Sequence, residues 1–238
     1  MDNWNGIGSL LIACVEILLL INLLIFAEKN KLNRIAIVMV ALLAGYQVME
    51  FLMCGIELQA PFFPYLAYVI ISFLPPLNLV LVLTLTHNLN HNPAHYLIFL
   101  PAVFFVIYYA FIIQQFAVTS CAVLYASYHY PLGELYAFFY YIPILISIIL
   151  LIGSVKRSPD KKIKFISKVL LGGNIFISIP VIFGFALLSA GDYSLISKIE
   201  SIMCKFAFVY AVCLAVVALR NTNNKNERNN SKYIPDNK

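Results

Sequence analysis

Charged residues are scarce in this chain. Only 11% of its 238 residues are Asp, Glu, Lys or Arg, whereas 62% are hydrophobic and the mean hydropathy is +0.87. Because about a quarter of the residues in an average soluble domain are charged, this composition excludes an ordinary soluble fold. The few charges gather in short breaks and at the end of the chain. Between them lie apolar blocks of about 20 residues, the length a helix needs to cross a bilayer core.

The chain also lacks the short motifs that mark well-known chemistry. It contains no Walker loop, dinucleotide fingerprint, GxSxG elbow, HExxH motif or CxxC pair. The apolar blocks do not alternate polar and apolar residues, as the strands of a membrane β-barrel do. We therefore expect a helical membrane protein without a cofactor, and nothing in the motifs indicates an enzyme.

Seven apolar stretches predict an all-α, polytopic seven-transmembrane helix bundle. The predicted spans are 6–27, 35–54, 65–86, 96–116, 135–155, 169–189 and 199–219. Residues 220–238 are almost entirely polar, which predicts a disordered cytoplasmic tail.

Lys and Arg predict the orientation of the bundle. Fourteen of the sixteen follow the first, fifth or seventh predicted span. Because positive loops stay in the cytoplasm, the N-terminus is expected outside and the C-terminus inside a cell (cytoplasmic) membrane. The net charge of +5 is explained by basic loops that face anionic lipid, so nucleic acid is not an expected partner.

Prolines lie within or near several predicted spans, at Pro75, Pro76, Pro101, Pro143 and Pro180. Each removes a backbone donor and is expected to kink its helix. Kinked helices leave space between them, so the bundle is expected to hold a cavity.

The longest external loop, about 117–134, is rich in Tyr. An aromatic belt at the membrane surface is the preferred interpretation, and a lid over the bundle is the alternative. Two of the five cysteines, Cys54 and Cys121, lie near the oxidising outer face. They are a candidate disulfide, although no spacing rule decides the pairing.

Three ionisable residues, Glu16, Glu50 and Lys205, fall within predicted spans, where a charge near the bilayer centre costs about 2.5–3.5 kcal/mol. At about 1.5 Å per residue, these residues and Gln47 lie roughly 7–13 Å from the outer ends of their spans. They therefore share one layer, in which Lys205 is the expected counter-charge.

Helical spacing predicts that these polar residues face the interior. Gln47 and Glu50 share a face of the second predicted span, and Ser201 shares a face of the last with Lys205. One interpretation is an outward-opening polar pocket formed by these four residues and Glu16. The other is a structural ion pair that only fixes helix packing.

Three histidines, His87, His91 and His95, recur every four residues after the third predicted span. On a continuous helix they would form a stripe able to bind Zn or Fe. Pro93 argues against that helix, and the remaining histidine, His129, is expected on the other side of the membrane. A plain polar loop is therefore preferred, with a metal site as the alternative.

Gln47-x-x-Glu50, Pro75-Pro76 and the stretch SIMCKFA that begins at Ser201 form a combination of motifs. It resembles a family of small, uncharacterised seven-helix bacterial membrane proteins, which have Q-x-x-E in the second span and a Ser-x-Trp-Cys-like motif in the last. The resemblance implies the architecture and no activity. LPPLNLVLVLTLTH and the Pro180 span followed by Asp192 are also similar to the seven-span sensor modules of bacterial histidine kinases.

Three classes of function fit these features. The first is a receptor-like or sensory bundle, in which the outer pocket binds a small polar or amphipathic ligand, or responds to pH, and the basic loop 156–168 contacts a cytoplasmic or membrane signalling partner. The second is a small-solute or proton transporter or channel, which needs a polar path continuing inward past Asn78, Thr84 and Asn174. The third is an intramembrane metal enzyme built on the histidines.

Overall fold

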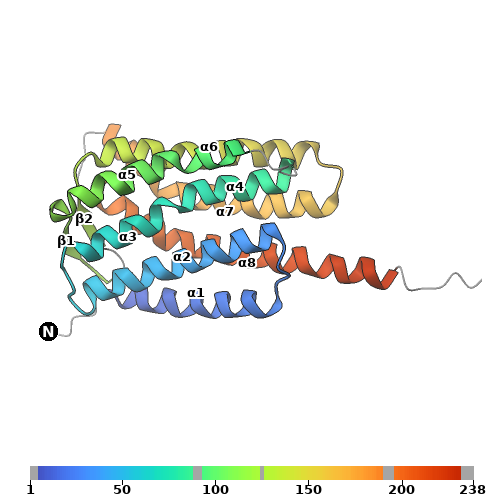
Figure 1. Cartoon of the computed structure of the whole chain (residues 1–238), viewed down its shortest axis with the longest axis horizontal. Coiled ribbons are helices and arrows are strands. Elements are labelled where there is room, and N and C mark those ends of the chain that lie inside the picture. Colours follow the sequence, from blue (N-terminus) through green and yellow to red (C-terminus); the bar gives the residue numbers. More distant parts are fainter. Residues whose placement is uncertain (1–4, 88–92, 124–125, 190–195, 232–238) are drawn as a thin grey trace, which may run out of the picture.

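The computed structural model of the chain describes residues 5–87, 93–123, 126–189 and 196–231. Its helices run up and down along one common direction (Figure 1). The helical elements are α1 (Ile7–Phe26), α2 (Lys31–Cys54), α3 (Phe62–Ser72), α4 (Leu74–His87), the 3-10 helix η1 (Pro93–Phe99), α5 (Leu100–Phe111), the 3-10 turn η2 (Ile113–Gln115), α6 (Gly133–Arg157), α7 (Lys161–Ser189) and α8 (Ile196–Ser231). The predicted all-α bundle is confirmed.

Six helical stretches within the described residues are long and apolar enough to cross a membrane. They are α1, α2, the α3–α4 pair, α6, α7 and α8. The fourth predicted span, 96–116, is not among these six stretches, because the apolar helix in it is shorter and covers only Tyr96–Phe111. The helix ends early because the chain turns at η2 and then enters a strand. These helices support a multi-pass membrane protein.

The prolines affect their helices in different ways. α3 ends at Ser72 and α4 begins at Leu74, directly before Pro75 and Pro76, so the helix is interrupted at Phe73 where the sequence predicts a kink. Pro143 and Pro180 lie inside α6 and α7, which continue through them. Pro101 lies in the first turn of α5, a position that tolerates a missing backbone donor, and the 3-10 helix η1 ends two residues before it.

Two helices extend into polar sequence beyond the predicted spans. α7 begins at Lys161 rather than at residue 169, and α8 continues to Ser231 rather than ending at 219. A helix that has already formed adds residues at little cost, so it passes beyond its apolar part. The structure therefore differs from the predicted disorder over residues 220–231, and residues 232–238 lie outside the described residues.

The predicted external loop contains a β-hairpin that the sequence interpretation missed. β1 (Ala117–Cys121) pairs antiparallel with β2 (Ala126–His129). Figure 1 places the hairpin at the end of the bundle where α1 begins, while the last part of α8 projects beyond the opposite end. The basic segments that follow α1, α6 and the apolar part of α8 all lie at that opposite end.

α2 lies at the centre of the packing, in contact with α1, α3, α4 and α8. Thirteen of its 24 residues are buried, whereas α1 buries few. The buried residues of α1 are Ser9, Ala13, Glu16 and Leu23. They recur on one side of the helix, so α1 packs on the bundle through a narrow stripe in which two of the four side chains are polar.

Candidate functional site

The Lys205 ammonium group joins three helices in the half of the bundle nearest the hairpin. From α8, its Nζ donates to Ser9 Oγ of α1 at 2.7 Å, and to Gln47 Oε1 and Glu50 Oε2 of α2 at 2.7 and 2.9 Å. The side chain of Lys205 is only 12% exposed, and that of Glu50 is 1% exposed. Because an ammonium group has three protons, these contacts use all of its donors.

The helical spacing in α2 presents Gln47 and Glu50 to Lys205 together. Besides accepting from Lys205, the Gln47 amide donates through Nε2 to the backbone oxygen of Cys204, at 3.1 Å. The amide therefore contacts both the side chain of Lys205 and the backbone of the preceding residue. This double contact fixes α8 against α2 at the level of the ion pair.

Glu16 lies on the same stripe of α1 as Ser9 but outside the Lys205 network. Its side chain is fully buried, and neither carboxyl oxygen has a hydrogen-bond partner among the described residues. Lys205 lies close enough to act on the Glu16 charge, but its three donors are already used. The predicted layer therefore divides into a hydrogen-bonded ion pair and a second carboxyl without a donor.

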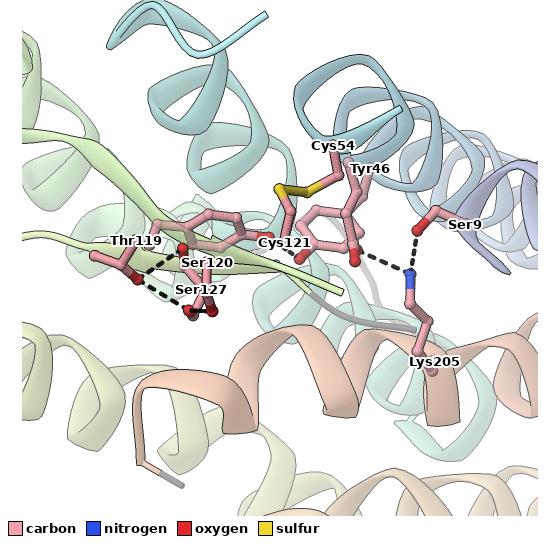
Figure 2. The surroundings of a disulfide bond; sticks show 10 residues. Ser9, Tyr46, Cys54, Thr119, Ser120, Cys121, Ser127 and Lys205 are labelled. Atoms are coloured by element: carbon pink, nitrogen blue, oxygen red, sulfur yellow. Dashed lines mark hydrogen bonds and ion pairs between the residues drawn. A yellow bond between two sulfur atoms is a disulfide. The ribbon is translucent and has the colours of Figure 1, made fainter. Parts of the chain in front are cut away.

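A disulfide attaches the hairpin to α2 above this network. Cys54, the last residue of α2, is bonded to Cys121 of β1, with the two Cα atoms 5.5 Å apart. This is the candidate pair that the sequence left undecided. The hydroxyls of Tyr46 in α2 and Tyr128 in β2 are also hydrogen-bonded. Figure 2 shows Tyr46 and the disulfide beside the contact between Lys205 and Ser9.

The hairpin also holds the start of α1. The backbone N–H of Gly6 donates to Ala122 O at 3.1 Å, and that of Gly8 donates to Val123 O at 3.2 Å. Donors in the first turn of a helix have no partner within the helix, so the hairpin satisfies two of them. Since β2 also packs against α8, the hairpin contacts the same three helices that Lys205 joins.

Sequence reasoning missed Ser9 and the contact between Tyr46 and Tyr128. Ser9 precedes Glu16 by seven residues, a separation that places both on one helix face. That spacing was a usable signal. No comparable signal pointed to the tyrosine pair, because its partners come from different elements.

A second polar cluster lies deeper in the bundle. Asn78 Nδ2 donates to Asn174 Oδ1 at 2.7 Å, and the Tyr210 hydroxyl donates to Asn78 Oδ1. All three side chains are buried. Thr84, the third residue of the predicted inward path, donates to the Val80 carbonyl of its own helix instead. The structure thus joins Asn78 to Asn174 but does not extend the cluster to Thr84.

A cavity of about 30 Å³ lies between the two polar clusters. Its lining includes Cys204 on one side and Asn78 and Tyr210 on the other, but most of its walls are apolar, with Met39, Leu43, Leu74, Ile144 and Met203 among them. About 10–15 Å³ of volume open to the centre of a water molecule is enough to hold one. The bundle therefore holds a cavity with room for about two water molecules.

The remaining predicted site residues cannot be placed in the same detail. His91 lies outside the described residues, as do the side chains of His87, His95 and Ser201. Among the residues that the structure does describe, no group of three His, Cys, Asp or Glu side chains could hold a metal ion.

No protein-family model and no curated protein matches this chain. The resemblance to the small seven-helix bacterial family therefore stays a prediction. Any function proposed for this chain therefore rests on the geometry of the Lys205 network and of the deeper polar cluster.

Proposed function

We propose that this protein is a receptor-like or sensory seven-helix bundle of a bacterial cytoplasmic membrane, with its N-terminus outside. The observation that supports this most is the buried Lys205–Glu50 network, which joins α1, α2 and α8 beneath a hairpin held by the same helices. A small polar or amphipathic ligand whose charge competes for Lys205 or Glu50 would release these helices from one another. Such a release could reach the basic end of the bundle, where a signalling partner would bind.

The proposed topology counts the η1–α5 segment as the fourth span. Seven residues of 3-10 helix and twelve of α-helix together extend about 32 Å. That length matches the roughly 30 Å of a bilayer core. The basic residues that follow α1 and α6 then lie on the same side as the end of α8, as the positive-inside rule requires.

The topology can be tested with epitope tags at the two ends of the chain. In bacterial spheroplasts, an antibody is expected to bind an N-terminal tag without permeabilisation and a C-terminal tag only after it. An odd number of spans places the two ends on opposite sides. If both tags were detected on one side, the number of spans would be even. The η1–α5 segment would then not cross the membrane, and the seven-span arrangement would be contradicted.

Transport is the second candidate, because both polar clusters use side chains of α8. Lys205 and Tyr210 are five residues apart, which is about 7.5 Å along a helix. A proton or small solute would have to cross the mainly apolar cavity between the clusters. That apolar gap and the absence of Thr84 from the inner cluster favour the receptor-like function over transport.

Ligand-dependent stabilisation and flux would separate the two functions. A panel of small carboxylates, amines and amino acids is offered to the protein in nanodiscs. We expect at least one to raise the Tm, because it stabilises the state it binds. The shift should be lost in Glu50→Gln, which keeps a hydrogen-bond acceptor for Lys205 but removes the charge. Glu57→Gln, at an exposed residue of the same end, is the matched control and should respond like the wild type.

Liposomes that contain the protein should show no proton flux above that of protein-free vesicles under a pH gradient. A flux that Glu50→Gln abolishes would overturn the receptor-like function in favour of transport. A panel without any stabilising compound would also count against a receptor.

A further inference from the structure

Glu16 is a buried acid that the Lys205 network leaves without a donor. Its side chain is fully buried, and neither oxygen is hydrogen-bonded within the part of the chain that the structure describes. An ionised carboxylate in such surroundings is strongly disfavoured relative to the neutral acid. This group therefore needs either a proton or a positive partner.

The charges around Glu16 provide no such partner in this arrangement. The charged groups of the cluster are Glu16 on α1, Glu50 on α2 and Lys205 on α8, and Lys205 already neutralises Glu50. The groups that act on the nearby Tyr46 of α2 are Glu50, Tyr128 of β2 and Cys204 of α8, and none of them carries a positive charge. A negative charge on Glu16 would thus leave the buried cluster with one uncompensated charge.

We propose that Glu16 is a proton-binding site, which holds a proton in this closed arrangement and exchanges it with water at the hairpin end of the bundle. When the Glu16 O–H bond breaks, the electron pair stays on the carboxylate and the proton passes to water. This inference rests on the proposed receptor-like function in one respect, since it adds the proton as a second ligand of the same site.

Loss of that proton would make Glu16 compete with Glu50 for Lys205. Glu16 lies two turns after Ser9, the present acceptor of Lys205, on the same buried stripe of α1, and Lys205 is close enough to act on its charge. Movement of the ammonium group to Glu16 would break its bonds to Ser9 and Glu50. The site would then have two alternative arrangements, selected by one proton.

Infrared spectroscopy of the full chain in nanodiscs tests the proton directly. We expect the carbonyl band of a protonated, weakly hydrogen-bonded carboxylic acid at neutral pH, and we expect alkaline pH to abolish it. The band should be lost in Glu16→Gln and retained in Glu57→Gln, which changes an exposed glutamate at the same end of the bundle and serves as the matched control. A wild-type spectrum without the band, or a band that persists in Glu16→Gln, would overturn the proposal.

Labelling of Cys204 tests the switch by a separate readout. Cys204 is buried beside Lys205, and the substitutions Cys14→Ser and Cys213→Ser leave it as the single cysteine outside the disulfide. Reaction with a water-soluble maleimide should increase with pH more steeply in this background than when Glu16→Gln is added. Equal pH dependence in the two would overturn the switch. The ligand panel and the flux assay test the receptor-like function separately from both readouts.

Discussion

Replacing Lys205 with methionine is expected to lower the free energy of unfolding by about 3–5 kcal/mol. Met is of similar length and apolar, so the helices can still pack. Glu50, however, keeps a buried charge without its partner, and Ser9 and Gln47 lose the donor that they share. An uncompensated buried charge is the larger part of the cost. Reversible denaturation of the purified protein in mixed micelles measures the change.

Two further variants make that measurement specific. Lys161→Met removes a positive charge from the exposed start of α7 and should cost less than about 1 kcal/mol. Adding Glu50→Gln to Lys205→Met should restore much of the lost free energy of unfolding, because the buried charge of Glu50 is then also removed. If Lys205→Met lowers the free energy of unfolding no more than Lys161→Met does, the ion pair does not hold the three helices together.

Removing the disulfide is expected to have the second large effect. The double substitution Cys54→Ser, Cys121→Ser opens a link across 67 residues of sequence. Such a link stabilises by about 2–4 kcal/mol, through the restriction that it places on the unfolded chain. The hairpin would then be held to α2 by the contact between Tyr46 and Tyr128. Faster cleavage between residues 117 and 129 by an externally added protease measures its release.

The control for this prediction is the double substitution Cys14→Ser, Cys213→Ser. Both cysteines lie outside the disulfide, so the thermal stability and the rate of cleavage should stay close to those of the wild type. If the protein without the disulfide is cleaved no faster than this control, other contacts hold the hairpin. The backbone bonds from Gly6 and Gly8 would then be the main attachment.

The helices could be predicted with good accuracy, and their ends less well. α1 covers Ile7–Phe26, within one residue of the predicted 6–27 at each end, because both of its flanks are polar. α2 and α7 begin earlier than predicted, at Lys31 and Lys161. A run of apolar residues identifies the part of a helix that can lie in lipid. The helix itself extends as far as its backbone hydrogen bonds continue. At α2, this point is set by the Asn30 side chain, which caps the Asn33 N–H.

The hairpin could not be predicted in the same way. Its strands are five and four residues long, and so short a hairpin is marginally stable alone. It is held by the disulfide to Cys54, by the contact with Tyr46 and by the first turn of α1. All of these partners are distant in sequence, so local pattern carried little information about the strands.

The sequence by itself determined that the chain forms apolar helices and that Gln47, Glu50 and Lys205 lie at a similar depth. Apolar length and helical rise fix both properties, and neither depends on how the helices pack. Only the tertiary structure decided which groups meet. The three protons of Lys205 go to Ser9, Gln47 and Glu50, and none remains for Glu16. That distribution depends on the relative rotation and spacing of α1, α2 and α8, and long-range packing alone sets these.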